Sequence, residues 1–220
     1  MGALGRRPIH TVFLDRDGTI NVKAADGEYV RAPADLVLLP GAARAVAALN
    51  AAGLRTILVT NQRWLSAPGT DSADYGAVHA RLRQLLAAEG AWLDAVYHCP
   101  HPAGVCGCRK PGAGMLLRAA REHGFDLAGA VIVGDSGADM MAGRSAGMAT
   151  VFIRAHGAGA GCGGEADAVT GAGGGYEADA VADDLSSAVR LILQSRAGPA
   201  GPAEPGAAAG AVFHAAPAGS

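Results

Sequence analysis

Short apolar runs alternate with alanine-rich stretches along most of the chain, and this alternation constrains the fold more than any other feature. The runs are rich in β-branched residues, which is typical of strands buried on both faces. Four runs are clear, at 9–14, 54–59, 130–133 and 150–153, and a weaker one lies at 93–97. Strands that alternate with helices form right-handed βαβ units, so the sequence predicts an α/β fold with a three-layer, doubly wound parallel sheet.

The stretches between and after these runs are expected to be helices, most of which end at a glycine, the usual C-terminal stop. The five predicted helices span 41–52, 71–89, 112–123, 138–146 and 185–193. In the second, four apolar residues share one face because they recur at helical spacing: Val78, Leu82, Leu85 and Leu86. Aspartates are expected to cap two helices, Asp71 the second and either Asp183 or Asp184 the last.

The chain has 220 residues, enough for one α/β domain, which we assign to residues 1–196. Two segments are too rich in small residues to build a core. The glycine-dominated stretch 155–175 is expected to be a mobile loop, and the Ala/Gly/Pro-rich stretch 197–220 a disordered tail. We expect a monomer, because no exposed apolar helix stripe is left over for a partner.

Composition argues against two classes of partner. With 18 Lys and Arg against 20 Asp and Glu, the formal net charge is -2, whereas proteins that bind nucleic acid usually carry a basic excess. No apolar run reaches the ~18 residues that a membrane helix needs. No apolar segment follows the two arginines near the start, so a secretory signal is not expected, and the predicted compartment is the cytoplasm.

Residues with the chemistry of phosphoryl transfer follow the first predicted strand, at the end where parallel sheets place their ligand sites. Of the carboxylates of Asp15 and Asp17, one can attack phosphorus while the other handles the proton of the leaving group. Mg²⁺ between carboxylate and phosphate would offset their repulsion. An Asp-rich turn closed by Gly18 is the alternative that these residues alone leave open.

Other polar residues near strand ends each have an ordinary alternative. Thr60 and Asn61 can hold phosphate oxygens or simply cap a strand-to-helix turn. Lys110, one of two lysines in the chain, can neutralise a transferring phosphoryl group or lie in solvent. Asp135 is suited to bind Mg²⁺, and Asp139 stands where a helix dipole favours any capping aspartate.

Three of the four cysteines lie within ten residues, together with a histidine. Cys99 and His101 are two residues apart, as are Cys106 and Cys108, so each pair can project two ligands from one turn. Three thiolates and an imidazole match a closed Cys₃His zinc site, which predicts a structural Zn²⁺ in a reducing compartment. Unrelated buried cysteines are the alternative. Cys162 is expected to be a spare thiol.

Taken together and in this order, these segments resemble the four motifs of the haloacid dehalogenase superfamily of phosphatases. The motifs are DxDGT at 15–19, Thr60, Lys110 and GDxxxD at 134–139, and the resemblance spans residues 9 to about 195. It implies a phosphatase that acts through an aspartyl-phosphate. Asp15 would be the nucleophile, and Asp17 would protonate the leaving oxygen and then activate water. The implied Mg²⁺ ligands are Asp15, the main-chain carbonyl of Asp17, and Asp135.

The resemblance also assigns the groups around the phosphate. Thr60 and Asn61 would hold its oxygens, Lys110 would stabilise their charge, and Asp139 would orient the lysine or the metal shell. The predicted zinc loop directly precedes Lys110, and it would stiffen the segment that delivers Arg109 and Lys110.

The loop CxH…CxCRKP, with DRDGTIN and VTNQ, resembles the zinc-loop subgroup that contains heptose-1,7-bisphosphate and histidinol-phosphate phosphatases. Members are small and capless, and the arginine before the lysine contacts substrate, which implies this role for Arg109. A small phosphorylated metabolite is therefore expected, with D-glycero-D-manno-heptose 1,7-bisphosphate first and histidinol phosphate second. A zinc-based binding module and an inactive scaffold of the same fold are the rival classes.

One segment departs from the subgroup. After VTNQ, relatives continue with a small residue and glycine, whereas this chain has Arg63, Trp64, Leu65 and Ser66. We expect Arg63 to lie near the pocket mouth and to pair with a second phosphate, because a guanidinium binds phosphate in a bidentate way. An arginine that points to solvent is the alternative.

Overall fold

The computed structural model of the chain describes residues 4, 7–25, 28–70, 72–154 and 177–197. Four predictions fall outside these residues: the mobile loop at 155–175, the spare thiol Cys162, the cap at Asp71 and, from residue 198 on, the disordered tail. Among the residues that are described, no helix is both long enough and apolar enough to cross a bilayer.

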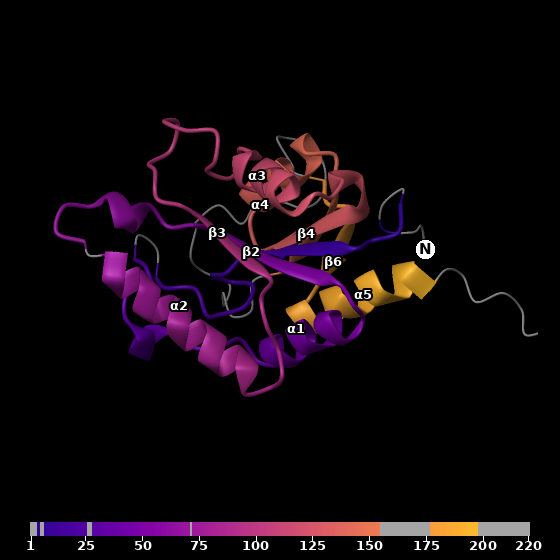
Figure 1. Cartoon of the computed structure of the whole chain (residues 1–220), viewed down its shortest axis with the longest axis horizontal. Helices are drawn as coiled ribbons and strands as arrows, with labels where there is room; N and C mark the ends of the chain where they lie inside the picture. Colours follow the sequence, from indigo (N-terminus) through magenta and orange to yellow (C-terminus); the bar gives the residue numbers. More distant parts are fainter. Residues whose placement is uncertain (1–3, 5–6, 26–27, 71, 155–176, 198–220) are drawn as a thin grey trace, which may run out of the picture.

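Six parallel strands form one sheet in the order β3-β2-β1-β4-β5-β6 (Figure 1). β1 (Thr11–Leu14) lies at the centre, between β2 (Arg55–Asn61) and β4 (Ala130–Gly134), and β3 (Ala95–Cys99) forms one edge. The predicted doubly wound parallel sheet is confirmed. Its strands follow the predicted apolar runs, although β2 and β3 continue to Asn61 and Cys99 and so carry site residues on their last positions.

The other edge of the sheet holds a strand that the sequence does not predict. β5 (Ala149–Ile153) matches an apolar run, and β6 (Ala180–Ala182) pairs with it in parallel. The Ala-Val-Ala of β6 is too short and too weakly apolar to give a periodic signal. Its strand conformation comes from pairing with β5, which is a tertiary effect.

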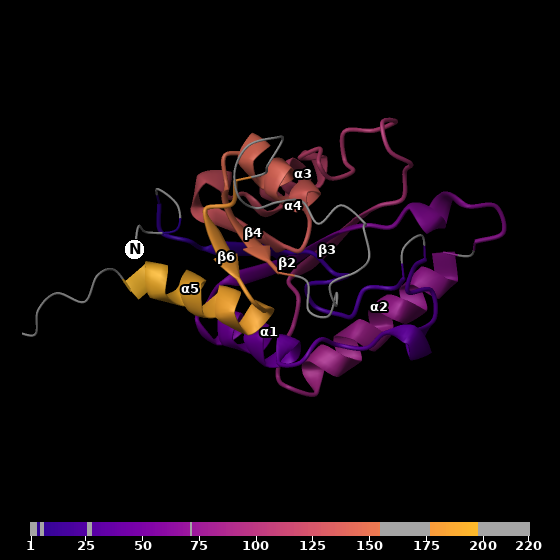
Figure 2. The same ribbon diagram turned by 180° about the vertical axis from the view of Figure 1, so that it is seen from behind.

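Helices cover both faces of the sheet and give it three layers. α1 (Ala42–Ala51), α2 (Ser72–Ala87) and α5 (Leu185–Ala197) lie on one face, and α3 (Gly114–His123) and α4 (Gly137–Ser145) lie on the other (Figure 1 and, from behind, Figure 2). All five predicted helices are confirmed. The largest difference in length is at α5, which continues past its predicted end at 193.

Smaller local features complete the description. Of the two aspartates considered as the cap of α5, Asp184 takes the role, because its carboxylate accepts a hydrogen bond from the Ser187 N–H at 2.6 Å. Three short 3-10 helices are not predicted by the sequence, since each is a single turn: η1 (Pro33–Asp35), η2 (Arg63–Ser66) and η3 (Leu127–Gly129).

Residues of the central strand point alternately into two cores. Val12 and Leu14 belong to the core beneath α1, α2 and α5, whereas Phe13 belongs to the core beneath α3 and α4, and all three are fully buried. The predicted apolar face of α2 packs into the first core, where its most deeply buried members are Val78, Leu82 and Leu86. Because apolar side chains hold β1 on both faces, the position of its carboxyl end is fixed.

The order of the strands places a crevice at that end. From β1 the chain crosses to β2 and β3 on one side and later returns to β4 on the other, which is the arrangement in which open α/β sheets bind ligands. The Asp15 N–H donates to the Val133 carbonyl at 3.0 Å, so the first residue after β1 stays in register with β4. The turn that follows passes through Gly18 with a φ of 85°, in the left-handed region that favours glycine.

Candidate active site

A polar pocket with a volume of about 270 Å³ opens at the carboxyl ends of β1, β2 and β4. The segment after β1 supplies a further wall that contains Glu28 and Tyr29. The predicted site residues in its lining are Asp15, Asp17, Thr60, Asn61, Arg109, Lys110 and Asp135. The structure therefore brings together residues that are far apart in the sequence.

Lys110 lies at the floor of the pocket, with 4% of its surface exposed. Its Nζ is 2.8 Å from Asp15 Oδ1 and 2.5 Å from Asp139 Oδ1, and it donates to the Val59 carbonyl at 3.0 Å. Burial alone would lower the pKa of Lys110, but the two carboxylates outweigh burial and raise the pKa above its usual value. The lysine is thus a stable cation between two aspartates, and the alternative of a solvated surface lysine is wrong.

Asp15 is the carboxylate directly after the central strand. Its Oδ1 accepts a hydrogen bond from the Arg16 N–H at 2.7 Å and pairs with Lys110. Burial raises the pKa of Asp15 to about 7; Lys110 opposes this shift, and the carboxylates of Asp139 and Asp135 add to it. A divalent cation beside these carboxylates would favour the ionised form, which is the form that attacks phosphorus.

The carboxylates of Asp15, Asp135 and Asp139 have oxygen atoms within 4.8 Å of one another. An all-oxygen donor set is what Mg²⁺ prefers. Gly18 leaves room for the cluster, because a Cβ at this position would collide with the Asp135 carboxylate. The described residues therefore fit Mg²⁺, with Asp15 and Asp135 facing the pocket.

Asp139 combines the two roles that the sequence leaves open. Its Oδ2 accepts hydrogen bonds from Ser136 Oγ at 2.5 Å and from the Ser136 N–H at 3.3 Å, which completes a capping box at the start of α4. Its Oδ1 pairs with Lys110. A Cβ at Gly134 would collide with Asp139, so glycine is needed for this packing. The start of α4 thus fixes the aspartate that holds the lysine.

Thr60 and Asn61 end β2 at the side of the pocket. Thr60 Oγ1 accepts a hydrogen bond from Gln62 Nε2 at 2.7 Å. Asn61 uses its amide on the main chain of Lys110: Nδ2 donates to the carbonyl at 3.0 Å, and Oδ1 accepts from the N–H at 3.1 Å. In this structure Asn61 positions the lysine, and its predicted contact with phosphoryl oxygens stays a prediction.

Sequence reasoning missed Arg16 and Gln62, which both donate hydrogen bonds to Asp17. Both side chains are fully buried, although arginine and glutamine are mostly exposed in proteins. Their positions were the available signal, because Arg16 stands between the two aspartates of the first motif and Gln62 directly follows the second strand.

The two arginines that the sequence assigns to the substrate take different places. Arg109 lines the pocket, and its Nη1 donates to the His101 carbonyl at 3.4 Å. Arg63 is exposed on η2 and is not among the described residues that line the pocket. Its neighbour Trp64 turns inward instead and donates to Gln62 Oε1 at 2.7 Å. The predicted contact of Arg63 with a second phosphate gains no support from the pocket lining and stays a prediction.

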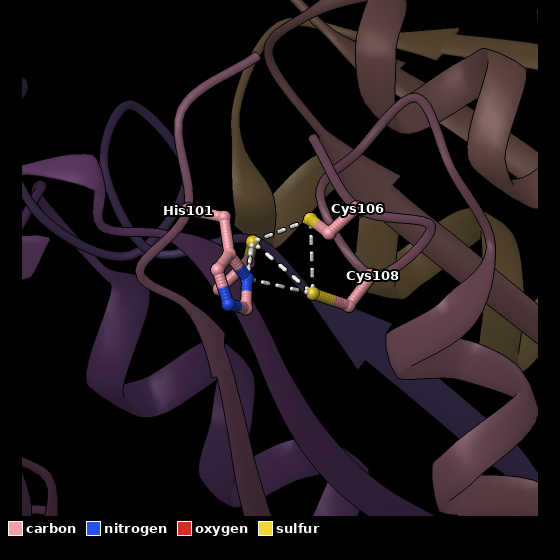
Figure 3. Close-up of side chains that lie close together, drawn as sticks. His101, Cys106 and Cys108 are labelled. Carbon is pink, nitrogen blue, oxygen red and sulfur yellow. Dashed lines mark hydrogen bonds between the residues drawn. The ribbon is translucent and has the colours of Figure 1, made fainter. Parts of the chain in front are cut away.

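Beside the pocket, four side chains form what we call the Cys/His cluster, namely Cys99, His101, Cys106 and Cys108. The three cysteines form no disulfide, and five of the six distances between their Sγ atoms and His101 Nδ1 run from 3.2 to 3.5 Å. Figure 3 shows His101, Cys106 and Cys108 turned toward one another. Zn–S bonds of about 2.3 Å in a tetrahedron imply donor separations of about 3.7 Å, only slightly larger than these. The donor set fits a tetrahedral zinc ion.

A sequence model of the haloacid dehalogenase-like hydrolase family matches residues 9–147, more than half of the chain. The chain belongs to the haloacid dehalogenase-like hydrolase family. A related hydrolase model matches residues 107–188. The resemblance inferred from the four motifs is therefore confirmed.

This haloacid dehalogenase-like hydrolase is similar to known heptose bisphosphate phosphatases. The D-glycero-β-D-manno-heptose-1,7-bisphosphate 7-phosphatase of Bordetella bronchiseptica is 38% identical over 144 residues, which make up 65% of this chain and 79% of the relative. The corresponding α-heptose enzyme of Mycobacterium bovis is 38% identical over 160 residues, 71% of this chain and 84% of the relative.

A solved structure gives the same result for the fold. The D,D-heptose 1,7-bisphosphate phosphatase from B. bronchiseptica, crystallised with magnesium and phosphate, matches with a TM-score of 0.71 and 34% identity over 84% of this chain and 99% of that chain. The chain is thus a phosphatase of the haloacid dehalogenase-like family.

Proposed function

We propose that this phosphatase depends on Mg²⁺ and removes the 7-phosphate of D-glycero-D-manno-heptose 1,7-bisphosphate. The observation that carries the proposal is the pairing of Asp15 with buried Lys110 on the floor of a pocket that also holds Asp17 and Asp135. The names of the relatives support the substrate, and the magnesium and phosphate of the solved neighbour support the cofactor.

In the first half-reaction, a carboxylate oxygen of Asp15 attacks the phosphorus of the ester. The new P–O bond forms as the bond to the sugar oxygen breaks, and Asp17 donates its proton to that oxygen so that it leaves as an alcohol. Lys110 and Thr60 stabilise the transferring phosphoryl group. Mg²⁺, held by Asp15, Asp135 and the main-chain carbonyl of Asp17, would neutralise charge between carboxylate and phosphate.

In the second half-reaction, Asp17 takes a proton from water while the water oxygen attacks the phosphorus of the aspartyl-phosphate. The P–O bond to Asp15 breaks, and inorganic phosphate leaves. Asp15 is again a carboxylate and Asp17 again carries a proton, so the enzyme is ready for another turnover.

The walls of the pocket support a substrate with a second anionic group. Arg109 and Lys23 line the pocket together with Lys110, and a guanidinium can pair with phosphate through two hydrogen bonds. Glu28 lines the same pocket and would attract the amine of histidinol phosphate, which makes that ester the second candidate substrate.

We also propose that the Cys/His cluster binds a structural zinc ion. Four protein donors complete a tetrahedral shell and leave no position for a catalytic water. The cluster directly precedes Arg109 and Lys110 in the chain, so a bound ion would restrain two residues of the pocket.

Phosphate release from a panel of esters tests the substrate. The panel contains both anomers of heptose 1,7-bisphosphate, because the names of the relatives differ in the anomer, and histidinol phosphate, each measured during a Mg²⁺ titration. We expect the highest kcat/KM for one of the two bisphosphates. A higher kcat/KM for histidinol phosphate would overturn the substrate assignment, and no release from any ester would favour an inactive scaffold.

We further propose that residues 1–196 act as one domain and that the protein is a cytoplasmic monomer. Among the described residues, the exposed large apolar side chains form no helix stripe: Val22 and Val37 lie side by side in the segment after β1, Trp92 precedes β3, and Leu117 lies on α3, which supports a monomer. The free thiols of the Cys/His cluster support a reducing compartment. Sedimentation equilibrium that gives a dimer mass would overturn the monomer.

A further inference from the structure

Four hydrogen-bond donors surround the carboxylate of Asp17. Its Oδ1 accepts from Arg16 Nε at 3.2 Å and from Asn21 Nδ2 at 2.9 Å. Its Oδ2 accepts from Arg16 Nη2 at 3.0 Å and from Gln62 Nε2 at 2.9 Å. Because each oxygen is held by two donors, and Arg16 binds both oxygens with its planar fork, the carboxylate has a fixed orientation at the pocket wall.

The orientation of Gln62 is in turn fixed by its own partners. Its Oε1 accepts from Trp64 Nε1 at 2.7 Å and from Arg16 Nη2 at 3.2 Å, two groups that can only donate. Its Nε2 must therefore face acceptors, and it donates to Asp17 Oδ2 and to Thr60 Oγ1. A single amide thus joins the aspartate that moves the proton to the threonine that faces the phosphate.

This network lies behind the pocket rather than in it. Arg16 and Gln62 are fully buried, whereas the side chain of Asp17 keeps 21% of its surface exposed. Among the described residues that line the pocket, neither Arg16 nor Gln62 is found. Neither side chain contacts the space where a substrate would lie, so any effect on the reaction passes through Asp17 or Thr60.

We propose that Arg16 and Gln62 are positioning residues that aim the carboxyl of Asp17 at the oxygen of the leaving group. The proposal rests on the proposed function, in which Asp17 is the acid of the first half-reaction. The four donors hold the ionised form, and when Asp17 takes up the proton that it gives to the leaving oxygen, the protonated oxygen gives up one of its donors. General acid catalysis contributes about 10²- to 10⁴-fold and requires the donor at hydrogen-bond distance from the reacting oxygen. A misplacement of about 1 Å can cost about 100-fold, so the residues that orient an acid control its contribution.

Substrates with different leaving groups distinguish the positioning of Asp17 from a role in phosphate binding or in folding. An alkyl phosphate, such as heptose bisphosphate, expels an alkoxide that needs a proton, whereas 4-nitrophenyl phosphate expels a stable phenolate that does not. The ratio kcat/KM covers the steps up to the release of the alcohol or phenol, and it therefore reports the first half-reaction alone.

Two substitutions weaken the hydrogen bonds that orient Asp17 and leave Asp17 itself unchanged. Gln62→Met removes the amide oxygen and the amide nitrogen at similar volume, and Trp64→Phe removes only the indole donor that orients Gln62. We expect Gln62→Met to lower kcat/KM by about 10- to 100-fold for the alkyl phosphate and by less than about threefold for 4-nitrophenyl phosphate. Trp64→Phe should give a smaller loss with the same selectivity, and Asp17→Asn sets the upper limit of that selectivity.

The matched control is Gln84→Met at an exposed position of α2, which should leave both kcat/KM values unchanged. Equal losses on the two esters, or no loss on either, would overturn the proposal. If Gln62→Met fails to fold, Trp64→Phe and Arg16→Lys test the proposal instead. Arg16→Lys keeps the positive charge but loses the planar guanidinium that binds both oxygens of Asp17. For each variant the loss in kcat/KM is again compared between the two esters. A wild-type protein inactive on both esters would instead overturn the proposed function, and this inference with it.

Discussion

Protonation of one buried histidine should weaken the fold in mild acid. His79 lies on α2 with 8% of its surface exposed, and its Nε2 is 2.7 Å from Tyr75 Oη. Burial lowers the pKa of His79 from 6.5 to about 4, and the nearby Arg16 guanidinium adds to the shift. The unfolded chain therefore takes up the proton more readily than the folded one, and stability is lost as the pH falls from about 6.5 towards 4.

These two pKa values predict the size of the effect. Between about pH 7.5 and about pH 5, the free energy of unfolding should fall by about 2 kcal/mol through His79 alone. The assay is urea unfolding at both pH values, with zinc and magnesium present, of the wild type and His79→Gln. Glutamine can still reach the Tyr75 hydroxyl but cannot ionise, so the fall should be about 2 kcal/mol smaller in the variant.

Comparison of the two proteins isolates the histidine, because other groups that titrate in this range contribute to both and cancel in the difference. Between about pH 7.5 and about pH 9, both proteins should change in parallel, since His79 is neutral there in the folded and the unfolded state. An equal fall towards pH 5 in both proteins would refute the reasoning, because it would mean that the imidazole is charged inside the fold without cost.

Four other substitutions bear on the site itself. Asp15→Asn should abolish phosphate release and keep the circular dichroism spectrum, because an amide cannot attack phosphorus; activity near wild type would contradict its role as nucleophile. Metal analysis should find about one zinc per chain, and Cys106→Ser should lower zinc content, stability and activity together; unchanged zinc content would count against the site. Arg109→Ala should lower kcat/KM for a bisphosphate by about tenfold more than for a monophosphate, as a charged hydrogen bond of ~1.5–3 kcal/mol implies. Arg63→Ala, measured in the same way, tests its predicted contact with a second phosphate, and equal effects on both substrates would rule that contact out.

Strands with two buried faces are visible in the sequence, and strands fixed by pairing are not. β1, β2 and β4 are continuous apolar runs because helices cover both sides of the sheet, and their ends locate Asp15, Thr60 and Asp135. β6 has only three residues, so its place comes from the neighbouring strand. The sequence therefore predicts the sheet and the end of it that carries the site.

The partners of the charged residues are the part that the sequence does not reveal. A single lysine resembles a surface lysine until carboxylates from distant segments surround it, as Asp15 after β1 and Asp139 at the start of α4 do with Lys110. Arg16 and Gln62 are hard to predict for the same reason, because residues of these types are usually solvated, whereas here both are fully buried at the ends of β1 and β2. Such pairings depend on long-range topology, and the sequence points to them only through the motifs, which imply that Asp139 orients the lysine and which contain Arg16 and Gln62.

The central place of β1 also determines when the site can form during synthesis. Phe13 pairs with Ile57 in β2 on one side and with Ile132 in β4 on the other. A nascent chain that ends after β3 therefore has one edge of β1 unpaired, and Asp15 has neither Asp135 nor Asp139 beside it. Unpaired edges recruit strands from other chains. Asp15 thus gains its acidic partners when β4 pairs with β1, and the open edge of the sheet then moves to β4 until β5 pairs with it.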